Sequence, residues 1–167
     1  MKSLEKDGVK ELLIKSWMTH DAMWFLSCLQ EFGIEKTNRM NKAAGRAMSA
    51  IMVKRIQKAV GVEKLDTFDE FKRFFEIATE ITKGEFMKYT YSMAEKNMLH
   101  LEWESCFSYK AAKELGVIDR YECGPMLPLE TYLDTLGIKY EVEPKVTGCM
   151  MHTDGRCFRD FRFFFEK

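Results

Sequence analysis

The chain has 167 residues, with 26 basic and 26 acidic side chains and therefore no formal net charge. That length suits one domain around a single core. A neutral chain without a basic block lacks the electrostatic footprint of a nucleic-acid-binding protein. The apolar runs are too short to span a bilayer, and the charged start MKSLEKDGVKELL is unlike a secretory signal. We therefore expect a cytoplasmic protein whose partners include neither nucleic acid nor a membrane.

The first half of the chain predicts helices. Apolar residues at helical spacing mark the first one, namely Val9, Leu12, Leu13 and Trp17. Thr19 is a candidate N-cap for a second helix, which Gly33 ends. A long third helix follows over about 36–59, and Thr67-Phe-Asp-Glu70 is a capping box that starts a fourth, ended by Gly84. Residues 1–84 are therefore expected to form a layer of about four helices.

After Gly84 the period of the apolar residues changes from about 3.6 to 2, which is typical of half-buried strands. Strands are expected at 86–94, 98–105, 138–142 and 157–166, and short helices at 106–116 and 128–137. The turn at 95–97 joins the first two strands. Helices followed by strands predict a single α+β domain over 1–167, in which the helical layer packs on an antiparallel sheet (85–167) with two short inserted helices.

The five cysteines are an odd number, which argues against a disulfide framework in a reducing compartment. Cys149-x-x-His152 would allow a sulfur and an imidazole to bind one ion from a single turn, and Cys157 follows an Asp154-Gly155 turn. With Cys123 as the fourth ligand, the set would be tetrahedral and suited to zinc rather than iron. Free thiols, buried or partly exposed, are the alternative.

Three further side chains and one cysteine are candidates for a site. Cys106 lies near a predicted helix N-terminus, where the helix dipole favours a thiolate that could act as a catalytic nucleophile. His20 and Asp21 could line a cleft between the helices and the sheet. Arg159, on a strand with Phe on both faces, either reaches an edge of the sheet or binds an anion.

The stretch SWMTHDAMWFLSCLQEFGIEKTNRMN, the long helix after it and the order Cys106, Cys123, Cys149, Cys157 carry a resemblance. They resemble small cytosolic bacterial and archaeal proteins of unknown function. Those look related to L-2-amino-thiazoline-4-carboxylic acid hydrolase-like proteins and, more remotely, to the four-vinyl-reductase small-molecule-binding domain. The family pattern has Cys-x-x-Cys at Cys149-x-x-His152 and an aromatic residue at Arg159. The resemblance implies an α+β fold with a ligand pocket between helices and sheet.

Three functions are compatible with these residues. The first is a binding module that holds a small molecule, or a metal through the cysteines and histidine of the second half. The second is a hydrolase of thiazoline or cyclic-amidine substrates that uses a thiolate or a metal-bound water. The third is an obligate homodimer without catalysis, formed through Phe- and Met-rich surfaces. We favour the binding module.

Overall fold

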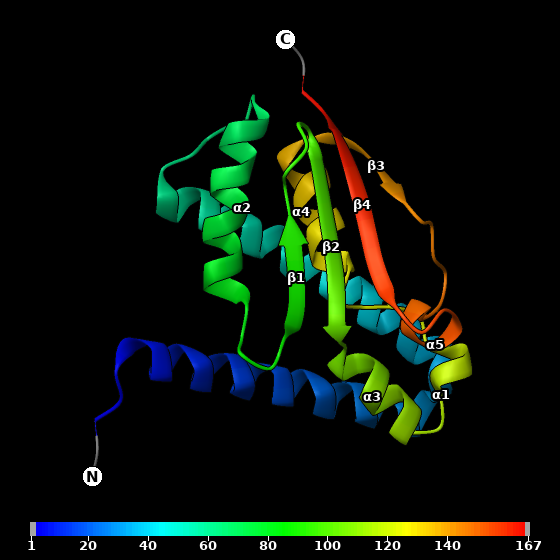
Figure 1. Ribbon diagram of the computed structural model, residues 1–167. Coiled ribbons are helices and arrows are strands. Elements are labelled where there is room, and N and C mark those ends of the chain that lie inside the picture. Colours follow the sequence, from blue (N-terminus) through cyan, green and yellow to red (C-terminus); the bar gives the residue numbers. More distant parts are fainter. Residues whose placement is uncertain (1–2, 166–167) are drawn as a thin grey trace.

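The structure is a computed structural model that describes residues 3–165, and it confirms an α+β fold with helices first and an antiparallel sheet after them (Figure 1). The elements in chain order are α1 (Lys6–Val60), α2 (Phe68–Thr82), β1 (Lys88–Ser92), β2 (Met98–Ser105), α3 (Phe107–Glu114), the 3-10 turn η1 (Ile118–Arg120), α4 (Leu127–Leu136), β3 (Lys139–Glu143), α5 (Met150–Thr153) and β4 (Cys157–Phe164). The predicted last strand therefore ends at Phe164, and Glu166 lies outside the described residues. No helix among residues 3–165 has the length and hydropathy needed to cross a membrane.

Helix α1 consists of two straight arms that meet at Gly33, whose φ of 73° and ψ of 172° interrupt the helical backbone. We call residues 6–32 the first arm and residues 34–60 the second arm. The predicted helix start at Thr19 is wrong, because the Thr19 hydroxyl donates to the Lys15 carbonyl (2.8 Å) within an unbroken helix. The helical layer thus has three helical segments, namely the two arms of α1 and helix α2, instead of about four helices. In Figure 1 the first arm, in blue, extends along the base of the molecule.

Helix α2 begins with the predicted capping box. The Thr67 hydroxyl accepts from the Glu70 amide (3.2 Å), and the Glu70 carboxylate accepts from the Thr67 amide (3.0 Å). The helix then buries one face against the sheet, where the Phe71 ring lies 4.7 Å from that of Phe163 and the Phe75 ring 5.0 Å from that of Tyr91. The capping box therefore orients an aromatic helix directly over the core.

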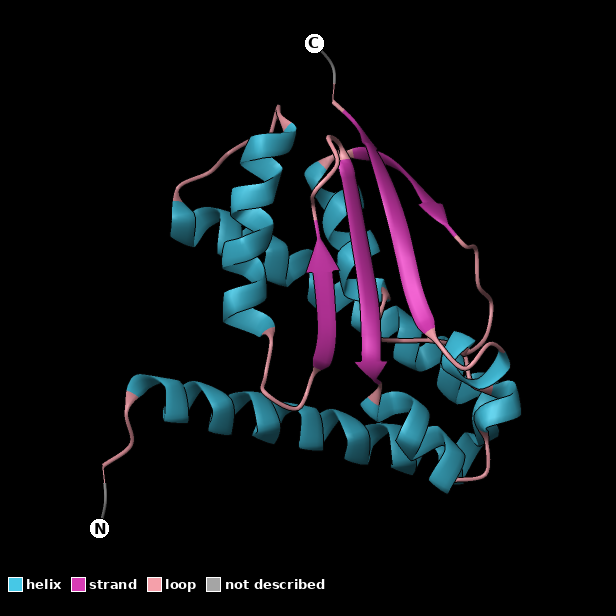
Figure 2. Ribbon diagram, viewed as in Figure 1, coloured by secondary structure: helices cyan, strands magenta, loops and turns pink. Residues whose placement is uncertain are grey.

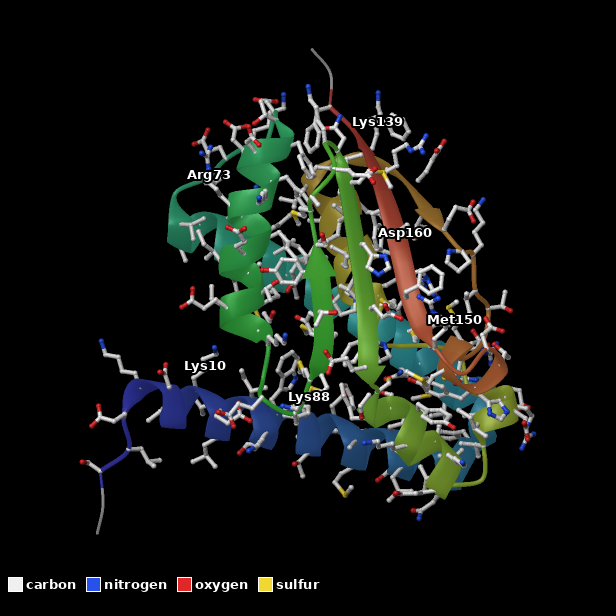
Figure 3. All side chains as sticks on the ribbon, in the orientation of Figure 1. Lys10, Arg73, Lys88, Lys139, Met150 and Asp160 are labelled. Atoms are coloured by element: carbon white, nitrogen blue, oxygen red, sulfur yellow. The ribbon has the colours of Figure 1, made fainter. Side chains whose placement is uncertain are left out.

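The four strands form an antiparallel sheet of order β1-β2-β4-β3. In the pairing of β2 with β4, Leu101 lies opposite Arg159 and Leu99 opposite Phe161. These alternate residues face the helices and are buried, and Figure 2 shows the helices gathered on that side of the sheet. The other face carries His100 and Asp160, whose Nδ1 and Oδ1 atoms are 2.6 Å apart; Figure 3 shows Asp160 on this uncovered face. The core thus lies between one sheet face and the helices.

Candidate functional site

A cavity of about 320 Å³ lies between the two arms of α1, helix α2, the buried face of β1 and β2, and the segment from α3 to α4. Its apolar lining consists of Trp17, Met18, Met48, Phe75, Met87, Tyr89, Leu101, Trp103, Phe107, Met126, Leu127, Leu129 and Tyr132. This position agrees with the pocket between helices and sheet that the family resemblance implies. The cavity is the most ligand-like feature of the described residues.

Small residues on the second arm keep this space empty. Ala44 and Gly45 lie on the cavity wall, at positions where a neighbouring helix face would ordinarily present large side chains. A Cβ atom placed on Gly45 would meet no atom within 4 Å, although its backbone is helical and would accept any side chain. The first arm then bounds the space from the other side through Trp17, Met18 and Asp21.

All polar side chains of the cavity except Asp21 are neutral; they are Asn41, Thr79, Thr82, Tyr89, Ser108, Tyr121 and Tyr132. Burial raises the pKa of Tyr89 and of Tyr132 to about 12 each, so both hydroxyls stay protonated at neutral pH. Asp21 is the one carboxylate of the lining; its side chain is exposed at the rim, where partial desolvation raises its pKa and His20 opposes that shift. The interior of the site is therefore suited to apolar matter.

The three predicted ligand-binding residues lie in different places. Asp21 borders the cavity, and its role in binding stays a prediction. His20 is exposed outside it and accepts a hydrogen bond from Trp24 Nε1 (3.2 Å). Arg159 is only 4% exposed and donates to the Phe158 carbonyl (2.7 Å) and the Met150 sulfur (3.5 Å), away from the cavity lining. Arg159 thus reaches no edge of the sheet, contrary to the simpler expectation.

The cysteines of the second half gather at the end of the core formed by α3, α5 and the start of β4. Cys106, Cys149 and Cys157 are buried, Cys123 is half-buried, and all are free thiols. Burial raises the pKa of Cys106, and the N–H groups of Tyr109 and Ser108 only oppose this in part. Burial also raises the pKa of Cys157 to about 11 and of Cys123 to about 12. The thiols of Cys106, Cys123 and Cys157 are therefore protonated at neutral pH, which gives no support to a catalytic thiolate at Cys106.

The predicted zinc ligands are not arranged around a common point. Residues 149–153 form the buried N-cap Cys149 and the single helical turn α5, and the His152 Nε2 atom lies at the surface, 2.9 Å from Asp119 Oδ1. Throughout residues 3–165, no group of three or more His, Cys, Asp or Glu side chains could hold a metal ion. Zinc at Cys123, Cys149, His152 and Cys157 stays a prediction for metal analysis to test.

The sequence predicted a cleft between the helices and the sheet but, apart from Asp21, not the residues that line it. Its lining comes from segments separated by up to about a hundred residues and consists mostly of ordinary apolar types. One signal was present, because a glycine at position 45 in the middle of a long helix lowers helix stability and calls for a packing or functional reason. Predicting which side chains face that glycine required the angle at which the two arms of α1 diverge from Gly33.

The fold and this site define a small α+β protein with a mainly apolar cavity, open to solvent on one side, between its helices and its sheet. The chain belongs to a family of unknown function (DUF6125), whose model matches residues 2–158. That agrees with the expected resemblance to an uncharacterised family. Comparison with curated proteins finds no match.

Among solved structures, the chain is similar to the crystal structure of a trafficking protein particle complex subunit 3 from Naegleria fowleri covalently bound to palmitic acid. The two share 11% sequence identity with a TM-score of 0.51, over 95% of this chain and 98% of the other. At this identity the likeness establishes a common fold. This structural neighbour is neither a thiazoline hydrolase nor a four-vinyl-reductase domain. The expected relation to those two groups of proteins therefore finds no support in it.

Proposed function

We propose that this protein binds a small, mainly apolar molecule non-covalently in the cavity between α1, α2, α4 and the sheet. The cavity itself carries the proposal: its volume of about 320 Å³ falls within the ~300–1,000 Å³ usual for ligand sites. The lining also has the usual composition of such sites, with many aromatic and apolar side chains and few polar ones. Met18, Met48, Met87 and Met126 contribute side chains that adapt to an occupant.

The structural neighbour indicates what shape the ligand could have. That crystal structure holds palmitic acid, so the shared fold can enclose an apolar chain. Covalent attachment needs a nucleophile, and none of the cavity-lining residues described here is a cysteine. The buried, protonated thiols of Cys157 and Cys123, which lie outside the lining, likewise favour a binding module over the hydrolase alternative. A non-covalent complex with a single chain or a flat ring system is therefore our expectation.

A blocking substitution at Gly45 tests this function. Gly45→Phe places a ring in the empty space without a backbone conflict, and Ala47→Phe adds the same ring at an exposed position of the same arm outside the cavity. Nile red, a neutral apolar dye, is the probe, with 1-dodecanol as competitor. We expect saturable dye binding that 1-dodecanol displaces, a loss of affinity of about tenfold or more in Gly45→Phe, and no change in Ala47→Phe. Equal affinity in both variants, or no saturable binding, would refute the proposal.

Self-association is a second candidate, and the exposed face of the first arm favours it. Five large apolar residues recur there at helical spacing, with exposures between 41% and 64%: Val9, Leu12, Leu13, Met23 and Trp24. The two apolar clusters, separated on this face by Ser16 and His20, together form an exposed stripe of a kind typical of an interaction surface. The zero net charge of the chain adds little repulsion between copies.

We propose that the occupant of this stripe is the same stripe of a second copy, packed antiparallel. If Leu13 of one copy lies opposite Trp24 of the other, Lys6 then lies opposite Glu31, so the two ends of the arm are complementary in charge. Sedimentation at micromolar concentration is expected to show a dimer that Leu13→Glu dissociates. Glu80→Gln, at an exposed site on α2, serves as the control. A wild-type monomer would eliminate this candidate without affecting the cavity.

A further inference from the structure

The charges around the cavity are one-sided. Asp21 is the single acidic residue of the lining, and the lining includes no lysine, arginine or histidine. Three basic residues that follow lining residues in the sequence have other partners: Lys42 pairs with Glu122, Arg46 acts on Glu130, and Lys83 donates to the Tyr89 carbonyl (2.8 Å) with its ammonium 4.3 Å from the Tyr89 ring centroid. Within residues 3–165, the Asp21 carboxylate makes no ion pair or side-chain hydrogen bond, and His20 is the neighbouring charge that acts on it. A carboxylate without an ion-pair partner thus borders a mainly apolar cavity whose other lining side chains are neutral.

The position of Asp21 makes this charge accessible to a ligand. It lies on the first arm one helical turn after Trp17 and beside Met18, both of which line the cavity. Its exposed side chain places it where the cavity meets solvent, so the apolar body of a ligand could fill the interior while its polar end stays at the rim. The partial desolvation at this site means that a nearby charge acts on Asp21 more strongly than it would in bulk water.

We propose that the cavity selects amphiphilic amines: molecules with an apolar body inside the cavity and an ammonium group paired with Asp21 at the rim. This inference rests on the proposed function and specifies its ligand. A free carboxylate in the same position would lie beside Asp21 with no basic side chain in the lining to pair with, so the two like charges would repel each other. A neutral end group would meet neither the attraction nor the repulsion. Affinity should therefore be highest for a ligand with an ammonium end group, lower for a hydroxyl and lowest for a carboxylate.

Three ligands with the same chain and different end groups test the order. Dodecylamine, 1-dodecanol and dodecanoate are each titrated against the Nile red complex at neutral pH, below their micelle concentrations. We expect dodecylamine to bind at least fivefold tighter than 1-dodecanol, and dodecanoate to bind more weakly than 1-dodecanol. Asp21→Asn should reduce the affinity for dodecylamine to the level of 1-dodecanol. The affinity for 1-dodecanol itself should change by less than twofold. Asp7→Asn, the same change at an exposed carboxylate of the first arm outside the cavity, should change none of the three.

The outcomes separate this inference from the function on which it rests. If 1-dodecanol binds and Gly45→Phe blocks it, but dodecylamine binds no tighter or is insensitive to Asp21→Asn, the amine preference is overturned and the apolar site stands. If none of the three ligands displaces the dye, the proposed function fails as well. Binding of 1-dodecanol by Asp21→Asn shows that the variant is folded, and Asp21→Glu should retain the preference for the amine.

Discussion

The cavity and the thiol-bearing end of the core are built from similar side chains but packed in opposite ways. At the cavity, the two arms of α1 diverge from Gly33, and the small residues Ala44 and Gly45 leave about 320 Å³ unfilled. At the thiol-bearing end, Cys149, Met150 and Cys157 are each at least 93% buried, and the Arg159 guanidinium donates to the Met150 sulfur. Residue types known for reactivity thus fill a packed region, whereas ordinary apolar residues surround the binding space. The arrangement of empty volume, more than chemical type, separates the two regions.

The largest expected difference between the two regions is in how much stability a Met→Ala substitution removes. Met150→Ala should lower the free energy of unfolding by about 2–5 kcal/mol, because it leaves a void in close-packed surroundings. Met48→Ala should cost about 1 kcal/mol or less, since this half-buried side chain already borders empty space. Urea unfolding midpoints at equal slope measure both. Equal losses would mean that the cavity region is as tightly packed as the thiol-bearing end.

A smaller effect should appear at alkaline pH. The pKa values of Cys157 and Cys123 rise from 9.0 to about 11 and about 12 in the folded protein. Stability from the neutral thiols is therefore fully present below pH 9 and is lost as the pH rises toward 11–12, because the unfolded chain ionises first. Each thiol should cost on the order of 1 kcal/mol at pH 10 relative to pH 8. Unfolding measured at both pH values should show a weaker decline in the Cys123→Ala/Cys157→Ala variant, and an unchanged decline would contradict burial of these thiols.

The smallest expected effect is a gain at the cavity wall. Gly45→Ala should raise the free energy of unfolding by about 0.5–1 kcal/mol, because the backbone is helical and the added methyl group meets no atom within 4 Å. Gly61→Ala is the matched control: this C-cap has a φ of 71°, so the same change should destabilise the protein. Thermal unfolding measures both. A loss of stability in Gly45→Ala would show that the wall is closed by atoms that the cavity geometry does not include.

Local patterns in the sequence were sufficient for most elements. The capping box at Thr67 and Glu70, the change of period after Gly84 and the turn at 95–97 predict α2, β1 and β2 close to their observed bounds, because the signals act over a few residues. The false start at Thr19 has the same origin. A threonine can cap a helix or donate to the carbonyl four residues earlier, and only the packing of the completed first arm selects the second state.

Which residues form the candidate site depends on how close they lie in the folded protein, and this cannot be read from their spacing along the chain. Cys149-x-x-His152 is compatible with a shared ion, yet the surroundings bury Cys149 and leave His152 beside Asp119. By itself, the sequence determined the α+β class, the order of helices and strands, and the neutrality of the chain, since these follow from local propensity and composition. The tertiary structure decided where empty volume remains and that Asp21 alone brings charge to it, because both result from how the two arms of α1 diverge over the sheet.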